Sequence, residues 1–157
     1  MLVAAAIATR TCWTAAPTTR PTLSGVILVV DHAELLRELL ALHLTGAGYT
    51  VALAEDAIVA GHHILRAGVP DLMIIDVHVP YLNGIEFVGA LKADRSIGSF
   101  PVLFLSADSS AMDRAYAAGA AAFLTKPVLA DRLLDAVQKQ LLPPRAAVVP
   151  ISAAKGY

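Results

Sequence analysis

The stretch that decides the fold is DLMIIDVHVPYLNG, residues 71–84. Its apolar run Leu72–Ile75 is short and unbroken, which is typical of a strand buried on both faces of a parallel sheet. Asp76 follows directly, so we expect its carboxylate at the carboxyl end of that strand, where ligands collect in an open α/β sheet. Pro80 and Gly84 then shape the next loop. A carboxylate fixed at that edge can hold a metal ion, act as a base or accept a phosphoryl group.

The same alternation of strand and helix patterns continues on both sides of this stretch. Strands are predicted at residues 26–30, 50–54, 72–75, 102–105 and 122–125. Helices are predicted at residues 33–44, 57–67, 84–93, 110–118 and 128–142, the last with Leu129 and Leu133 facing inward. Strands that alternate with helices form a parallel sheet covered on both faces. The predicted fold class is α/β, a flavodoxin-like (βα)5 doubly wound sheet with strand order 2-1-3-4-5.

Composition and charge narrow the class of protein. The 157 residues suit one domain with tails: an N-terminal extension (1–24), a domain (25–142) and a C-terminal tail (143–157). The mean hydropathy is +0.64, but no apolar stretch approaches the ~18–20 residues of a membrane helix. A net charge of −1 gives no electrostatic footprint for nucleic acid. Cys12 is the only cysteine, so no internal disulfide can form and a cytoplasmic location is predicted.

Polar side chains follow the predicted strands where each one ends. Asp31 and His32 follow the first strand, Asp76 the third, Ser106 the fourth and Lys126 the fifth. Because parallel strands share one carboxyl edge, these residues should converge there. Two carboxylates, a hydroxyl and an ammonium suit phosphoryl chemistry. Asp76 would attack, Lys126 and Ser106 would hold the transferred oxygens, and Asp31 would help to hold a cation.

Each of these residues also has a purely structural interpretation. Asp31 and Asp76 could cap helices, because N-cap aspartates are common after strands. Ser106 could cap the next helix or simply end a strand, and Lys126 could be an ordinary solvated lysine. The placement of all four at strand ends favours a shared site.

Several motifs together match one known family. They are Ile27-Leu-Val-Val-Asp31, Asp76 followed by Pro80 and Gly84, Leu105-Ser106-Ala107, Ala118-Gly119-Ala120 and Phe123-Leu-Thr-Lys126-Pro127. Over about residues 25–142 the chain resembles a response-regulator receiver domain, the phosphoacceptor module of two-component signalling. It is similar in particular to stand-alone receivers of the chemotaxis type.

The resemblance implies a role for each matching residue. Asp76 would be the phosphorylated aspartate, and Ser106 the hydroxyl that moves toward the phosphoryl group. Phe123 would be the aromatic switch that turns inward with it. Lys126 would pair with the phosphoryl oxygens, and its bond to Pro127 is expected to be cis. The chain would then be a phosphoacceptor rather than an enzyme, with at most self-phosphorylation and dephosphorylation activity.

The resemblance also implies a Mg²⁺ ion at Asp31, Asp76 and the backbone carbonyl of His78. The family usually carries a second acidic residue after the first strand, whereas this chain has His32. Imidazole is a poor ligand for Mg²⁺, so we expect weaker Mg²⁺ binding and slower phosphoryl transfer. The two histidines and two aspartates could instead form a mixed nitrogen and oxygen site that favours Mn²⁺ or Zn²⁺.

Two functions follow from this pattern. The first is a single-domain response regulator that accepts a phosphoryl group on Asp76 from a histidine kinase or phosphotransfer protein and signals by protein contact. The second is a receiver-like docking module that needs no phosphorylation. No effector domain is expected after Leu142, so the output surface would be the fourth helix, fifth strand and fifth helix. Receivers also form homodimers through that face; direct binding to nucleic acid or membrane is not expected.

Two other classes of protein fit the pattern less well. Phosphatases of the haloacid dehalogenase type need a second aspartate two residues after the first, where His78 stands here. A flavodoxin needs a phosphate loop rich in hydroxyl groups and glycine after the first strand, and residues 31–34 offer neither.

Overall fold

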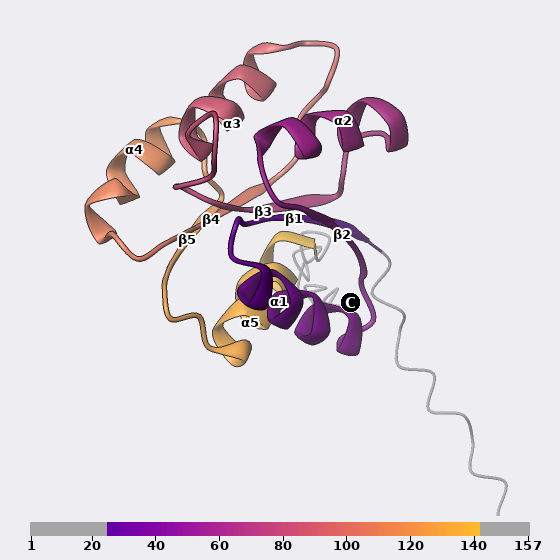
Figure 1. Cartoon of the computed structure of the whole chain (residues 1–157), viewed down its shortest axis with the longest axis vertical. Coiled ribbons are helices and arrows are strands. Elements are labelled where there is room, and N and C mark those ends of the chain that lie inside the picture. The colour runs from indigo at the N-terminus through magenta and orange to yellow at the C-terminus, as the bar shows by residue number, and fades with distance from the viewer. Residues whose placement is uncertain (1–24, 142–157) are drawn as a thin grey trace, which may run out of the picture.

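The computed structural model shows one open sheet with helices on both faces and describes residues 25–141 (Figure 1). The predicted extension (1–24) and tail (143–157) lie outside the described residues. The strands are β1 (Val26–Val30), β2 (Thr50–Ala54), β3 (Leu72–Asp76), β4 (Val102–Ser106) and β5 (Ala122–Thr125). They pair in parallel in the order β2-β1-β3-β4-β5, which confirms the predicted flavodoxin-like α/β fold.

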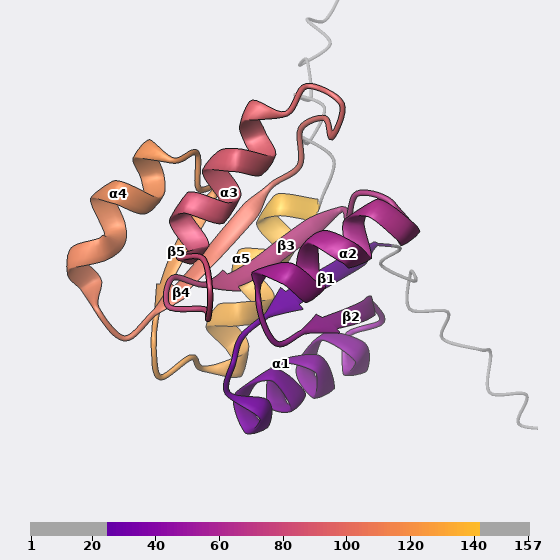
Figure 2. The same ribbon diagram turned by 45° about the horizontal axis from the view of Figure 1, so that its top comes forward.

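The helices divide between the two faces of the sheet. They are α1 (Glu34–Gly46), α2 (Ala57–Ala67), α3 (Gly84–Ala93), α4 (Met112–Ala117) and α5 (Ala130–Leu141), with a short 3-10 helix, η1 (Ser109–Ala111), before α4. Helices α1 and α5 cover one face, and α2, α3 and α4 cover the other (Figures 1 and 2). Within residues 25–141, no helix combines the length and apolar character needed to cross a bilayer.

The period of two along each strand determines which side chains fill each layer. Leu72 and Ile74 of β3 pack toward α1 and α5, whereas Met73 and Ile75 pack toward α2, α3 and α4. Asp76 continues the parity of Leu72 and Ile74. In the same way, Asp31 continues the parity of Ile27 and Val29, which face α1 and α5 from β1. The two carboxylates therefore leave adjacent strands on the same side of the sheet.

Some predicted helix ends were wrong. The last helix begins at Ala130 rather than 128, and its first backbone hydrogen bond runs from Leu133 N–H to the Leu129 carbonyl. Leu129 thus precedes the first turn and is 63% exposed rather than inward, although Leu133 is buried as predicted. The predicted helix at 110–118 is a 3-10 turn followed by the short α4, and Gly119 follows at φ 95°.

Tyr49 is the buried side chain with the least favourable polar environment. Only 4% of the residue is exposed, and it packs in the layer under α1 and α5. Within the described part of the chain, its hydroxyl has no hydrogen-bond partner. Burial raises the pKa of Tyr49 because the phenolate would lose its hydration.

We therefore expect Tyr49→Phe to leave the free energy of unfolding unchanged or to raise it by up to about 1 kcal/mol, since it removes a buried polar group that gains no bond. Urea unfolding followed by circular dichroism measures the change. Tyr116→Phe, at a residue that is 48% exposed, is the matched control. A loss above about 1 kcal/mol in Tyr49→Phe alone would show that the hydroxyl has a partner in solution.

Candidate functional site

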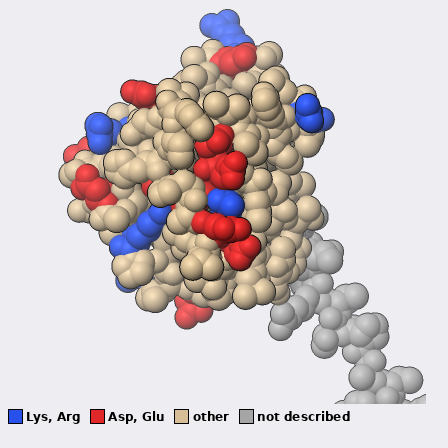
Figure 3. All heavy atoms as spheres, in the orientation of Figure 1, with Lys and Arg blue, Asp and Glu red and all other residues tan. Residues whose placement is uncertain are grey.

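Three charged side chains meet at the carboxyl edge of the sheet. The Lys126 Nζ donates hydrogen bonds to Asp31 Oδ2 at 2.8 Å and to Asp76 Oδ2 at 2.5 Å. Lys126 lies 95 residues after Asp31 and 50 after Asp76, so only the fold brings them together. Strands β1 and β3 are neighbours, which places the two aspartates side by side. Figure 3 shows exposed acidic side chains on either side of a basic one near the middle of the view, whereas Asp31 and Asp76 themselves are buried.

Because the carboxylates of Asp31 and Asp76 are buried, their charges must be balanced by Lys126. Asp31 is fully buried and Asp76 is 3% exposed, so neither carboxylate is hydrated as in water. Two such charges repel each other, and the ammonium between them offsets that repulsion. Partial burial by itself lowers the pKa of Lys126, but hydrogen bonds and attraction from both aspartates outweigh it and raise the pKa above its ordinary value. Lys126 is therefore charged at neutral pH.

Backbone N–H groups hold the other carboxylate oxygens. Ala33 N–H donates to Asp31 Oδ1 at 2.8 Å, and His78 N–H donates to Asp76 Oδ1 at 2.9 Å. The N-caps of α1 and α3 are Ala33 and Asn83, so neither aspartate caps a helix. The alternative of two capping aspartates is therefore wrong, and both carboxylates are oriented toward the shared edge.

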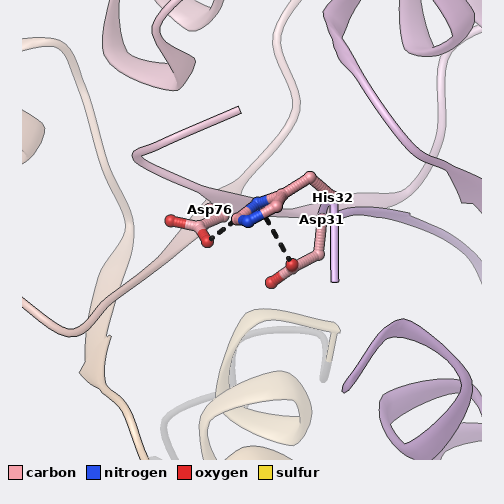
Figure 4. A group of neighbouring side chains, drawn as sticks. All are labelled: Asp31, His32 and Asp76. Carbon is pink, nitrogen blue, oxygen red and sulfur yellow. Dashed lines mark ion pairs between the residues drawn. The ribbon is translucent and has the colours of Figure 1, made fainter. Parts of the chain in front are cut away.

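The side chain of His32 lies close to both aspartates. Its imidazole extends between the two carboxylates (Figure 4), with Nδ1 3.8 Å from Asp31 Oδ1 and 4.0 Å from Asp76 Oδ2. The side chain is 54% exposed, so the ring forms the outer wall of the site. Asp31, His32 and Asp76 each offer one ligand atom, and these atoms lie within 4.8 Å of one another.

Within residues 25–141, the side chains of Ser106 and Phe123 make no hydrogen bond to the three charged side chains. Ser106 ends β4 and is fully buried; its hydroxyl accepts a hydrogen bond from Asp108 N–H at 3.0 Å. The N–H of Lys126 donates to the Ser106 carbonyl at 2.8 Å, which ties the lysine to β4. Phe123 of β5 is half-buried and packs against the layer of α2, α3 and α4. Asp108, not Ser106, caps η1 through Ser110 N–H.

The loop after β3 is fixed by close contact with the strand end. Gly84 N–H donates to the Val77 carbonyl at 2.9 Å, and a Cβ at Gly84 would collide with the backbone carbonyl oxygen of Asp76. Pro80 is exposed in this loop, and its carbonyl accepts from Leu82 N–H. The Lys126–Pro127 peptide bond, expected to be cis, is cis.

Sequence reasoning missed two residues of this region. Arg37 donates from Nη1 to the backbone carbonyl of Asp31 at 2.6 Å, which ties α1 to the site. Tyr81 has a φ of 70°, a left-handed conformation that is uncommon for a residue with a large side chain. Its position between a proline and an Asn-Gly pair is a turn signal, but it does not identify which residue becomes left-handed.

A hollow of about 490 Å³ opens beside the charged group. His32, His78 and Tyr81 line it together with the loop residues Val79, Pro80, Leu82 and Asn83. The predicted His78 therefore reaches the site in two ways: its N–H binds Asp76, and its exposed side chain lines the entrance.

The donor set partly fits a hard divalent cation. The carboxylates of Asp31 and Asp76 are the oxygen ligands that Mg²⁺ prefers. The third group, the imidazole of His32, is a nitrogen ligand that Mg²⁺ accepts poorly. Lys126 already occupies part of the space between the carboxylates.

Comparison with known proteins gives consistent matches. The model of the family described as "Response regulator receiver domain" matches residues 27–138. Response regulator MprA of Mycobacterium ulcerans is 39% identical over 115 residues, covering 71% of this chain and 48% of that protein. Response regulator Rre1 of Synechocystis is 35% identical, covering 74% of this chain and 51% of that protein. The chain thus spans about half the length of these curated relatives.

A solved structure of similar size also matches. The chemotaxis response regulator CheY4 of Vibrio cholerae superposes with a TM-score of 0.69 and 30% identity. The match covers 76% of this chain and 99% of CheY4.

The packing of Gly84 leads to a stability prediction. We expect Gly84→Ala to lower the free energy of unfolding by about 1–3 kcal/mol, because the Cβ must displace the backbone at Asp76. Gly89→Ala, in the same helix but with open space at its Cβ, should instead raise it by about 0.5–1 kcal/mol. Urea unfolding of both variants checks the pair, and equal shifts would contradict the close packing of Gly84.

Proposed function

This chain belongs to the response regulator receiver domain family, and we propose that it accepts a phosphoryl group on Asp76 and signals through protein contact. Receiver domains are signalling modules of two-component systems. The observation that carries the proposal is the buried Asp76 carboxylate, bound by Lys126 beside Asp31 at the sheet edge. We propose a histidine kinase or a phosphotransfer protein as the donor. A cytoplasmic location stays a prediction.

In the proposed step, a phosphoryl group moves from an imidazole nitrogen of the donor to the carboxylate of Asp76. A carboxylate oxygen of Asp76 forms a bond to phosphorus while the bond from phosphorus to the donor's imidazole nitrogen breaks. The electron pair of that bond returns to the donor nitrogen, and the product is an aspartyl phosphate. The ammonium of Lys126 stands beside Asp76, where it can bind a transferred oxygen as negative charge accumulates. Asp31, which shares the lysine, keeps it in place.

Receiver domains bind Mg²⁺ at an acidic pocket, and here Asp31 and Asp76 with the carbonyl of His78 would hold it. When bound, the cation neutralises charge on the phosphoryl oxygens. The imidazole of His32 supports the expectation that Mg²⁺ binds weakly at this site.

We propose that the output surface is formed by α4, β5 and α5. The N–H of Lys126 donates a hydrogen bond to the Ser106 carbonyl, and Phe123 lies on the strand next to that of Ser106. A hollow of about 360 Å³ on this surface is lined by Met112, Phe123 and Leu129, among others, and Leu129 is largely exposed. A phosphoryl group that attracts Ser106 and releases the space near Phe123 would shift this surface between two states.

A second candidate is a docking module that works without phosphorylation. The observation that favours it is His32, which occupies the outer wall of the site where a ligand for Mg²⁺ would be expected. If Asp76→Asn leaves binding to the downstream target unchanged, this second function is the better description.

We expect incubation of the full chain with acetyl phosphate and Mg²⁺ to add the mass of one phosphoryl group. Asp76→Asn should abolish the gain, because the nucleophile is gone. Lys126→Ala should slow it by at least ~10-fold, because a donor to the transferred oxygens is lost. Intact mass spectrometry over time measures both effects.

Asp113→Asn, at an exposed aspartate of α4, is the matched control and should behave as the unmodified chain. A mass gain that survives Asp76→Asn would contradict the assignment of the acceptor. So would the absence of any gain at saturating Mg²⁺ in a chain shown to be folded by circular dichroism.

A further prediction concerns transmission of the signal. Phosphorylation should shift the amide resonances of α4, β5 and α5, and Ser106→Ala should reduce those shifts while Asp76 is still modified. The reason is that the hydroxyl couples the phosphoryl group to the output surface. Heteronuclear NMR before and after acetyl phosphate measures the shifts, with exposed Ser99→Ala as control. Full shifts in phosphorylated Ser106→Ala would rule out this coupling.

A further inference from the structure

Asp31, His32 and Asp76 offer a set of ligands with mixed chemical preference. Two are carboxylate oxygens and one is an imidazole nitrogen, and the three atoms lie within 4.8 Å of one another. Carboxylates suit Mg²⁺, Ca²⁺ and Mn²⁺, whereas imidazole suits Zn²⁺, Ni²⁺ and Cu²⁺. The nitrogen therefore decides which ion gains the most from this site.

The distances are close to those of a bound ion. Ligand atoms about 2.1 Å from a tetrahedral Zn²⁺ lie about 3.4 Å apart. His32 Nδ1 is 3.8 Å from Asp31 Oδ1 and 4.0 Å from Asp76 Oδ2, and all three ligand atoms lie within 4.8 Å of one another. Closure around the ion therefore needs the imidazole to approach each carboxylate by roughly half an ångström and the two carboxylates to approach each other by at most about 1.4 Å. The carboxylates are buried and held by backbone N–H groups, whereas the His32 side chain is 54% exposed and its ring lies between them (Figure 4).

The surroundings allow an ion to enter and to keep water ligands. The hollow of about 490 Å³ is lined by His32, one of the three ligands, and by His78, and it provides space for water beside the imidazole. At this site two carboxylate groups face the single ammonium of Lys126. The ammonium of Lys126 repels every divalent ion alike, so it lowers affinity without changing the preference among ions of equal charge.

We infer that this site selects a divalent transition-metal ion, with Zn²⁺ as the test case, over Mg²⁺ and that the Nδ1 of His32 is a direct ligand. A single nitrogen ligand benefits Zn²⁺ and gives Mg²⁺ little, in line with the order of affinities of divalent metals for nitrogen sites. The inference concerns the ion at the site of the proposed function, but ion binding is measurable without phosphoryl transfer. The inferred ion preference and the proposed phosphoryl transfer can therefore be refuted independently.

The test is a calorimetric titration of the full chain with Zn²⁺ and with Mg²⁺. All proteins carry Cys12→Ser, because a thiolate is itself a strong zinc ligand. His32→Ala should weaken Zn²⁺ binding by at least ~10-fold and change Mg²⁺ binding by less than about 2-fold. His32→Asp should strengthen Mg²⁺ binding and reduce the preference for Zn²⁺ by at least ~10-fold, because an oxygen replaces the nitrogen.

Two further measurements locate the bound ion. Asp31→Asn should weaken Zn²⁺ binding as His32→Ala does, and His62→Ala, at an exposed imidazole of α2, should leave it unchanged. In NMR spectra, the Nδ1 resonance of His32 should shift at one equivalent of Zn²⁺. Loss of Zn²⁺ and Mg²⁺ affinity by equal factors in His32→Ala would overturn the inference, as would Zn²⁺ binding indifferent to His32 and Asp31. Phosphorylation of Asp76 in Mg²⁺ would be unaffected by that failure.

Discussion

The contact of the Lys126 ammonium with the carboxylates of Asp31 and Asp76 is the interaction on which the site depends. Two unit charges 4 Å apart repel by about 4 kcal/mol at an effective dielectric constant of 20, and these two carboxylates are almost completely buried. A cation from β5 must therefore reach across to β3 and β1. The intervening strand β4 ends in Ser106, a small side chain, and its carbonyl binds the Lys126 N–H. The position of Lys126 beside Asp76 and the charge balance of the site thus depend on the same contact.

Other contacts at the carboxyl edge of the sheet fix the positions of Asp31 and Asp76. Backbone N–H groups bind one oxygen of each aspartate, and Arg37 ties the first helix to the carbonyl of Asp31. Gly84 lets the loop after β3 approach the Asp76 backbone more closely than any side chain would permit. The proposed acceptor, Asp76, is thus held in place, whereas Phe123 on the proposed output surface is only half-buried. This difference suits the proposed switch, because a local change of charge can shift an element between two states.

His32 stands where the resemblance to receiver domains leads us to expect a second acidic residue. Its imidazole lies between the two carboxylates and forms the open wall of the site. The same residue underlies the expected weakness toward Mg²⁺, the alternative of a docking module and the inferred preference for transition metals. All three rest on one physical fact: a neutral nitrogen ligand contributes neither the charge nor the hard oxygen of a carboxylate.

Much of this structure could be predicted from the sequence. Unbroken apolar runs predicted the strands, helical spacing predicted the helices, and the alternation of the two predicted the strand order. Because parallel strands share one carboxyl edge, the positions of Asp31, Asp76, Ser106 and Lys126 at strand ends followed from the same pattern. The errors arose at ends, as with the exposed Leu129, where a residue lies just outside the first helical turn and periodicity no longer applies.

What the sequence by itself determined is therefore the architecture and the set of groups at its edge. Only the tertiary structure decided how those groups meet: that Lys126 bonds both aspartates, that neither aspartate caps a helix, that His32 turns between them, and that the Tyr49 hydroxyl lacks a partner within residues 25–141. The reason is that periodicity is a local property of the chain. A contact across 95 residues depends on strand order, loop geometry and side-chain rotamers that no local pattern specifies.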